Sequence, residues 1–176
     1  EMGDSLTAIN LGSGITAKSI VAGGSHTCAL LDDNSSKCWG EGENGQVGQE
    51  KTSDDRVPPT LSITIGTDRT ATAITAGDAH TCAILDNSSI KCWGLNDSGQ
   101  LGQGNTINLG DNANEINPIS KVIDLGAGRT VGGIAAGDDY TCAVLDNASI
   151  KCWGGNAFGQ LGLGDDSTRG DESGEM

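Results

Sequence analysis

Six cysteines are the residues of this chain whose type and spacing most clearly permit chemistry. They form three pairs, and within each pair one cysteine precedes and the other follows a short polar turn. In an antiparallel hairpin centred on that turn, the paired positions face each other with Cα atoms about 4.5 to 5.5 Å apart, which a disulfide can bridge. The sequence therefore predicts three disulfides, Cys28–Cys38, Cys82–Cys92 and Cys142–Cys152.

Buried free thiols and a zinc site are the alternative interpretations of these cysteines. Structural zinc favours cysteines two to four residues apart with further ligands nearby, and these pairs are more widely spaced. The histidines that precede the first two pairs, His26 and His80, are replaced by Tyr140 in the third. The disulfide interpretation is favoured. Because disulfides persist in oxidising compartments, it predicts an extracellular protein, either secreted or at the cell surface.

Four asparagines stand in Asn-x-Ser sequons, the acceptor sequence for N-glycosylation. Asn34, Asn87 and Asn147 fall at the turn of each cysteine hairpin, and Asn96 lies in a glycine-rich loop. Turns favour Asn and Ser for their own backbone geometry, so one isolated sequon would mean little. The recurrence at an exposed hairpin tip predicts glycans on this set of asparagines.

Catalytic chemistry is not indicated by the remaining polar residues. His26 and His80 are expected to form hydrogen bonds within their own blades, since Tyr140 at the third position argues against a shared catalytic role. No base has a partner constellation suited to nucleophilic catalysis, so we predict that the chain is not an enzyme. The recurring Trp39, Trp93 and Trp153 are expected to serve packing rather than carbohydrate stacking.

The strongly acidic composition limits the possible partners. The formal net charge is −14, which disfavours nucleic acid and anionic membrane surfaces. No apolar run reaches the roughly 18 residues of a membrane span. No cofactor is predicted. Calcium stays an open alternative because oxygen ligands cluster in two acidic loops, although without a recognised spacing. The acidic residues concerned are Asp165, Asp166, Asp171, Glu172, Glu175, Asp111 and Glu115.

The elements that position these residues form an internal repeat. Short apolar segments such as "SIVAG", "TCALL", "IKCWG" and "QLG" recur between glycines and polar clusters, which is typical of short strands. We divide the chain into repeats at 16–69, 70–129 and 130–176. The third is completed by residues 1–15 of a next copy or preceding segment. Each repeat is too small to bury its own apolar face, so stacked copies must build the core.

The repeated "AGxxHTCAL", Cys-Trp-Gly and Asn-x-x-Gly-Gln-Leu-Gly resemble the regulator of chromosome condensation repeat family over essentially the whole chain. The resemblance implies an all-β fold of three tandem four-stranded antiparallel blades. The best-known members close seven blades into a propeller. Here the blades would form an open, continuing array or part of a propeller.

The two ends of the chain match each other. Residues 170–176 followed by 3–12 reproduce the pattern of the linker 110–126. We therefore expect copies of this chain to associate end to end. The function we expect is a non-catalytic extracellular structural protein, the building block of a glycosylated fibre or surface array. A propeller-type module that binds a protein or a glycan is the alternative.

Overall fold

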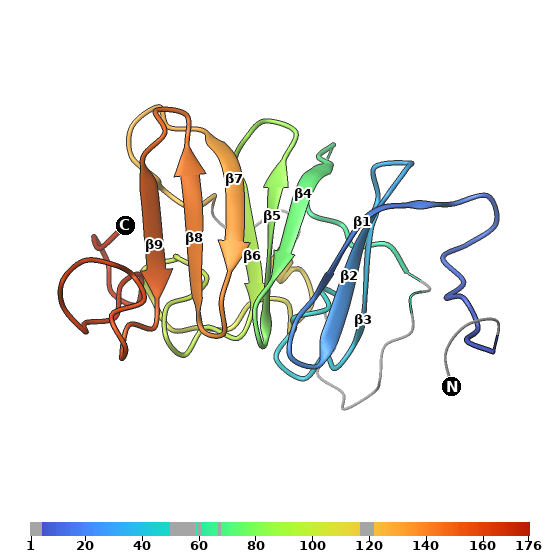
Figure 1. The fold of residues 1–176 in the computed structure, drawn as a ribbon, viewed down its shortest axis with the longest axis horizontal. Coiled ribbons are helices and arrows are strands. Elements are labelled where there is room, and N and C mark those ends of the chain that lie inside the picture. The colour runs from blue at the N-terminus through green and yellow to red at the C-terminus, as the bar shows by residue number, and fades with distance from the viewer. Residues whose placement is uncertain (1–4, 50–58, 60, 67, 117–121) are drawn as a thin grey trace.

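The chain forms three small antiparallel sheets that stand side by side in a row (Figure 1). The computed structural model describes residues 5–49, 59, 61–66, 68–116 and 122–176. The first and third sheets lie at opposite ends of the row, and the second sheet lies between them. The expectation of an all-β chain of tandem blades is confirmed.

Each sheet contains three strands in sequence order. The strands are β1 Ala17–Ala22, β2 His26–Leu31 and β3 Ser36–Gly40 in the first sheet, β4 Ala71–Ala76, β5 His80–Leu85 and β6 Ile90–Gly94 in the second, and β7 Val131–Ala136, β8 Tyr140–Leu145 and β9 Ile150–Gly154 in the third. The register is the same in all three, including an irregularity near the start of β1, β4 and β7. The repeated sequence thus folds as a repeated structure.

The fourth strand expected in each blade is absent from the described sheets. The segment around Leu101 turns instead of extending, because Gly99 and Gly102 adopt φ of 72° and 64°, in the left-handed region that breaks a strand. In the second and third blades a single bridge is found in its place, Gly94 to Leu109 and Gly154 to Arg169. The blades described here therefore have three strands, and the prediction of four was wrong.

The hydrophobic core lies between the sheets rather than within one of them. One cluster joins the first and second sheets and includes Leu30, Ile63, Ile74 and Trp93. A second cluster joins the second and third sheets and includes Ile84, Ile123, Val131 and Trp153. As the repeat length required, each blade buries its apolar surface only against a neighbour.

Candidate functional site: the interface between blades

A main-chain carbonyl is the centre of each contact between blades. In the first interface, the Gln46 carbonyl accepts hydrogen bonds from Thr81 Oγ1 at 2.9 Å and from Trp93 Nε1 at 3.0 Å. In the second interface, the Gln100 carbonyl accepts from Thr141 and Trp153 at 3.0 Å each. The recurring Gln and Trp are thus parts of one repeated docking unit.

The glutamine side chain holds this carbonyl in place by closing its own loop. Gln46 Oε1 accepts from the backbone N–H of Asn44, and Gln100 Oε1 accepts from that of Ser98. Gln160 in the third blade makes the same bond with Phe158 at 2.9 Å. The third blade therefore has the same loop, although the described chain places no further blade against it.

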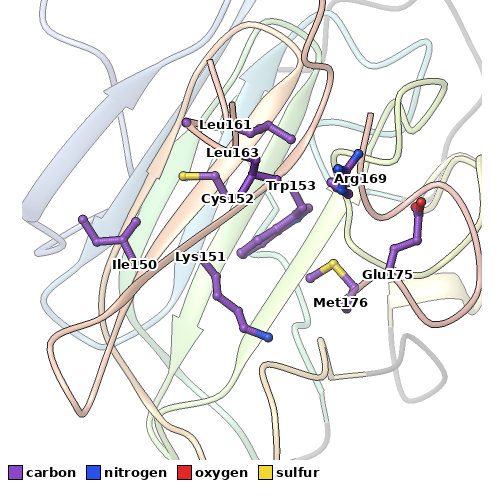
Figure 2. Close-up of a pocket in the computed structure, with 10 residues that line it drawn as sticks. Ile150, Lys151, Cys152, Trp153, Leu161, Leu163, Arg169, Glu175 and Met176 are labelled. Carbon is purple, nitrogen blue, oxygen red and sulfur yellow. The ribbon is translucent and has the colours of Figure 1, made fainter. Parts of the chain in front are cut away.

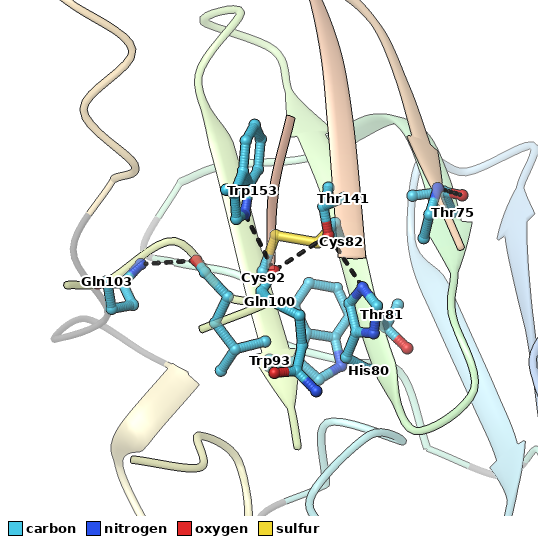
Figure 3. The surroundings of a disulfide bond; sticks show 12 residues. Thr75, His80, Thr81, Cys82, Cys92, Trp93, Gln100, Gln103, Thr141 and Trp153 are labelled. Atoms are coloured by element: carbon cyan, nitrogen blue, oxygen red, sulfur yellow. Dashed lines mark hydrogen bonds between the residues drawn. A yellow bond between two sulfur atoms is a disulfide. The ribbon is translucent and has the colours of Figure 1, made fainter. Parts of the chain in front are cut away.

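The two histidines complete the docking units from the other side. His26 Nε2 lies 2.8 Å from Thr81 Oγ1, and His80 Nε2 lies 2.9 Å from Thr141 Oγ1, as Figure 3 shows for the second interface. Because each threonine hydroxyl donates its proton to a glutamine carbonyl, the histidine must donate through Nε2–H. Both histidines form hydrogen bonds as expected, but they bond to the next blade, so the prediction that these bonds lie within one blade was wrong.

Burial keeps both histidines neutral. Burial, with a smaller contribution from the proximity of His26, lowers the pKa of His80 to about 4. Burial also lowers the pKa of His26 to about 4, although the backbone and the carboxylate of Asp78 favour its charged form. A neutral imidazole with the proton on Nε2 therefore fits both interfaces at neutral pH.

All six cysteines form disulfides within their own hairpins. Cys28–Cys38, Cys82–Cys92 and Cys142–Cys152 are opposed across neighbouring strands with Cα atoms 4.0 to 4.1 Å apart. The first two bridges are fully buried between blades, whereas the third is half-buried on the last sheet. The second bridge lies next to the His80–Thr141 contact (Figure 3). The disulfides therefore stabilise the same surfaces that join the blades.

The hairpin turns that carry three of the sequons are exposed, but their asparagines are not equivalent. Asn87 and Asn147 each accept bonds at Oδ1 from a serine two residues later. In the first blade, Asp33 takes this role, and Asn34 occupies the next position with φ of 64°. The first sequon is therefore offset by one residue. The sequence already indicates this offset, because Asn34 lies one residue further from its preceding cysteine than Asn87 and Asn147 do.

The structure removes Asn96 from the predicted glycosylation set. Its side chain is fully buried, and Nδ2 donates to the carbonyls of Asn105 and Ile107 at 2.8 and 3.0 Å. A glycan on this nitrogen would replace those bonds inside a closed loop. Asn156 makes the corresponding bonds in the third blade without a sequon, which marks the position as structural.

The acidic loops stabilise their own backbone. Glu115 Oε2 accepts from the backbone N–H groups of Gly110 and Asn112, and Glu175 repeats this with Gly170 and Glu172. Partial burial and a hydrogen bond shared with Glu115 raise the pKa of Asp111. In the part of the chain that the structure describes, no three His, Cys, Asp or Glu side chains gather as a metal site would require.

The two outer faces of the row contain unmatched halves of the docking unit. We call the outer face of the first sheet the head face, and it includes Ile20, Thr27 and Trp39. We call the outer face of the third sheet, with its adjoining loop, the tail face, and it includes Val144, Ile150, Leu161 and Gly162. Ile20 is 62% exposed and its equivalent Ile74 only 7%, while Ile150 is 66% exposed and its equivalent Ile90 is 0%.

Three such blades define a β-propeller-type repeat protein. Family models identify the repeat family to which it belongs. The chain belongs to the regulator of chromosome condensation (RCC1) repeat family. One model of this repeat matches residues 17–46, 71–100 and 133–160. A second model matches residues 38–84 and 92–144.

Curated relatives contain the same repeats in longer chains. The ultraviolet-B receptor UVR8 of Arabidopsis thaliana is 36% identical over 83% of this chain and 31% of its own length. The E3 ubiquitin-protein ligase HERC2 of Homo sapiens is 32% identical over 81% of this chain and 3% of its own. The chain thus spans about a third or less of the length of these relatives.

Solved structures show the same fold. Yeast RCC1 (Prp20), crystallised with Kap60, superposes with a TM-score of 0.69 at 23% identity over 88% of this chain and 36% of that one. Human WBSCR16 gives 0.69 at 20% identity, with 92% and 41% covered. The ectodomain of the Physcomitrella patens receptor kinase CR4 gives 0.51 at 20%, with 81% and 31% covered.

Proposed function

We propose that this chain is a non-catalytic extracellular structural protein whose blades, each stapled by a disulfide within its own hairpin, continue one against the next into an N-glycosylated fibre or surface array. One observation carries the proposal. The same docking unit is used twice inside the chain, and its two unmatched halves remain on opposite outer faces. A repeat of this kind gains stability from each added neighbour.

An extracellular place is supported by the disulfides. All six cysteines are bonded, and such bonds persist where the surroundings are oxidising. Among the described residues, no helix combines the length and the apolar character of a membrane span. The CR4 neighbour is itself described as an ectodomain, so this fold is compatible with the same setting.

Glycans would decorate the hairpin tips of such an array. Asn34, Asn87 and Asn147 are exposed, whereas the docking units lie between the sheets. Sugars on these exposed tips would add hydrophilic bulk outside the apolar clusters between the sheets. We therefore keep these three asparagines in the proposal.

Intact-mass measurement of the native protein, with and without reduction and enzymatic removal of N-glycans, tests this function. We expect a mass increase of six hydrogens per copy of this sequence on reduction, since each of the three disulfides gains two. We also expect sugar-sized heterogeneity that disappears on glycan removal. A native protein with free thiols and no sugar would contradict both the extracellular location and the N-glycosylation.

A further inference from the structure

We infer that the tail face of one copy binds the head face of a second copy of this chain, with Ile9 and Leu11 of the second copy entering a pocket beside Ile150. This inference rests on the proposed function and names the partner in it. Four features of the two faces support it.

The first feature is a pocket beside strand β9, at the border of the tail face. It has a volume of about 400 Å³, and its lining includes Ile150, Cys152, Trp153, Leu161 and Met176 (Figure 2). In the two internal interfaces, a linker isoleucine lies against the corresponding strand. The backbone N–H of Ile63 donates to the Ser36 carbonyl at 2.8 Å, and that of Ile123 donates to the Ile90 carbonyl at 3.4 Å. The pocket is the place that such a linker would fill.

The second feature is the segment that would fill it. The sequence Ile9-Asn10-Leu11-Gly12 matches Ile123-Asp124-Leu125-Gly126. Both segments close the same local turn, because Gly12 N–H donates to Asn10 Oδ1 at 3.0 Å and Gly126 N–H donates to Asp124 Oδ1 at 2.9 Å. Ile123 and Leu125 are buried in the second interface, whereas Ile9 is 54% exposed. The head segment thus has the docking conformation, held on its own blade by Lys37 Nζ at 2.8 Å from the Leu11 carbonyl, while no second sheet covers Ile9 among the described residues.

The third feature is an open glycine on the tail face. A Cβ placed on Gly48 would lie 3.0 Å from Trp93 Nε1 and 2.9 Å from Ile63, and one on Gly102 would lie 2.8 Å from Trp153 Nε1. Nothing lies within 4 Å of the same position on Gly162. The backbone surface that receives the next blade's tryptophan is therefore formed but vacant.

The fourth feature is the matching set of hydrogen-bonding groups. Gln160 holds its loop as Gln46 and Gln100 do, so its carbonyl is set to accept from a following threonine and tryptophan. Thr27 and Trp39 occupy those positions on the head face, and both are half-buried rather than buried. Tyr140 replaces the histidine of the internal interfaces and offers a hydroxyl there. No histidine is needed at the junction.

These faces favour a heterologous, head-to-tail contact, which leaves a new tail after each addition. Each copy has a formal net charge of −14, so copies repel one another at low ionic strength. We therefore expect association to strengthen as salt is added.

Sedimentation velocity over a concentration series of the purified, oxidised chain tests the inference. The variants are Ile150→Asp on the tail face, Ile20→Asp on the head face and Ile107→Asp as a matched control. Ile107 is also 66% exposed but lies on neither face. Each face variant should weaken association about 100-fold or more, since it places a charge in an apolar contact. The control should associate like the wild type, and circular dichroism should show that all three variants remain folded.

Mixing the two face variants gives the decisive result. Each is blocked at one face only, so the mixture should form a one-to-one dimer and stop there. A face variant that still dimerises alone would indicate a two-fold contact and overturn the inference, as would a wild type that stays monomeric throughout. If the wild type stays monomeric, the blades could still continue within a longer covalent chain. The intact mass of the native protein tests that possibility. A closed ring of wild-type copies would support this interface but contradict the fibre.

Discussion

Acid should destabilise this protein through its two buried histidines. Each has a pKa of about 4 in the folded chain against about 6.5 when unfolded. Between these values the unfolded state binds more protons than the folded state, so stability falls as the pH falls. The contribution is intact above pH 6.5 and is lost progressively toward pH 4.

The magnitude follows from the two pKa values. Lowering the pH from 7 to 5 should cost about 2 kcal/mol for each histidine, and so about 4 kcal/mol for His26 and His80 together. That is a large part of the stability of a small domain, which is about 5 to 15 kcal/mol. The loss of stability should affect both internal interfaces, because each histidine bonds to the threonine of the next blade.

Urea denaturation at pH 7 and pH 5 measures this loss. The control is the double variant His26→Gln/His80→Gln, whose amide N–H groups can replace Nε2–H but do not titrate. All carboxylates are shared by the two proteins, so the difference in their pH dependence isolates the histidines. An equal loss of stability in both proteins would refute the assignment of neutral, buried imidazoles.

Two further predictions concern the blade faces. Gly102→Ala should destabilise the chain by about 1–3 kcal/mol more than Gly162→Ala in thermal unfolding. Both positions have positive φ, but only the first would push a methyl against Trp153. Under limiting reductant, Cys142 and Cys152 should be alkylated first in peptide mass spectra, since the other two bridges are buried. Assembly should remove this difference, because a docked copy would cover the third bridge.

The disulfide hairpins could be predicted from sequence because strand pairing is a local matter of register. Cys82 and Cys92 face each other once the turn between them is placed, and that turn is marked by Asp, Asn and Ser. The stacking of blades followed from the repeat itself, since a unit of this size must bury its apolar face against another. These parts of the fold depend on spacing alone.

The features that sequence reasoning missed depend on where a polar group points. Asn96 looks like a sequon, yet its amide closes a loop around Asn105 and Ile107. The Gln100 carbonyl that accepts from Thr141 belongs to the main chain. Every residue has such a carbonyl, so the residue type at this position does not predict the bond. The expected fourth strand failed for a related reason, because glycines on either side of Leu101 favoured a turn over a strand.

Electron cryomicroscopy of the assembled wild-type protein tests the central claim most directly. We predict a continuous row of blades in which the contact from Gln160 to Thr27 and Trp39 of the next copy reproduces the two contacts inside each chain. Isolated three-blade particles, or copies joined through any other surface, would contradict the account.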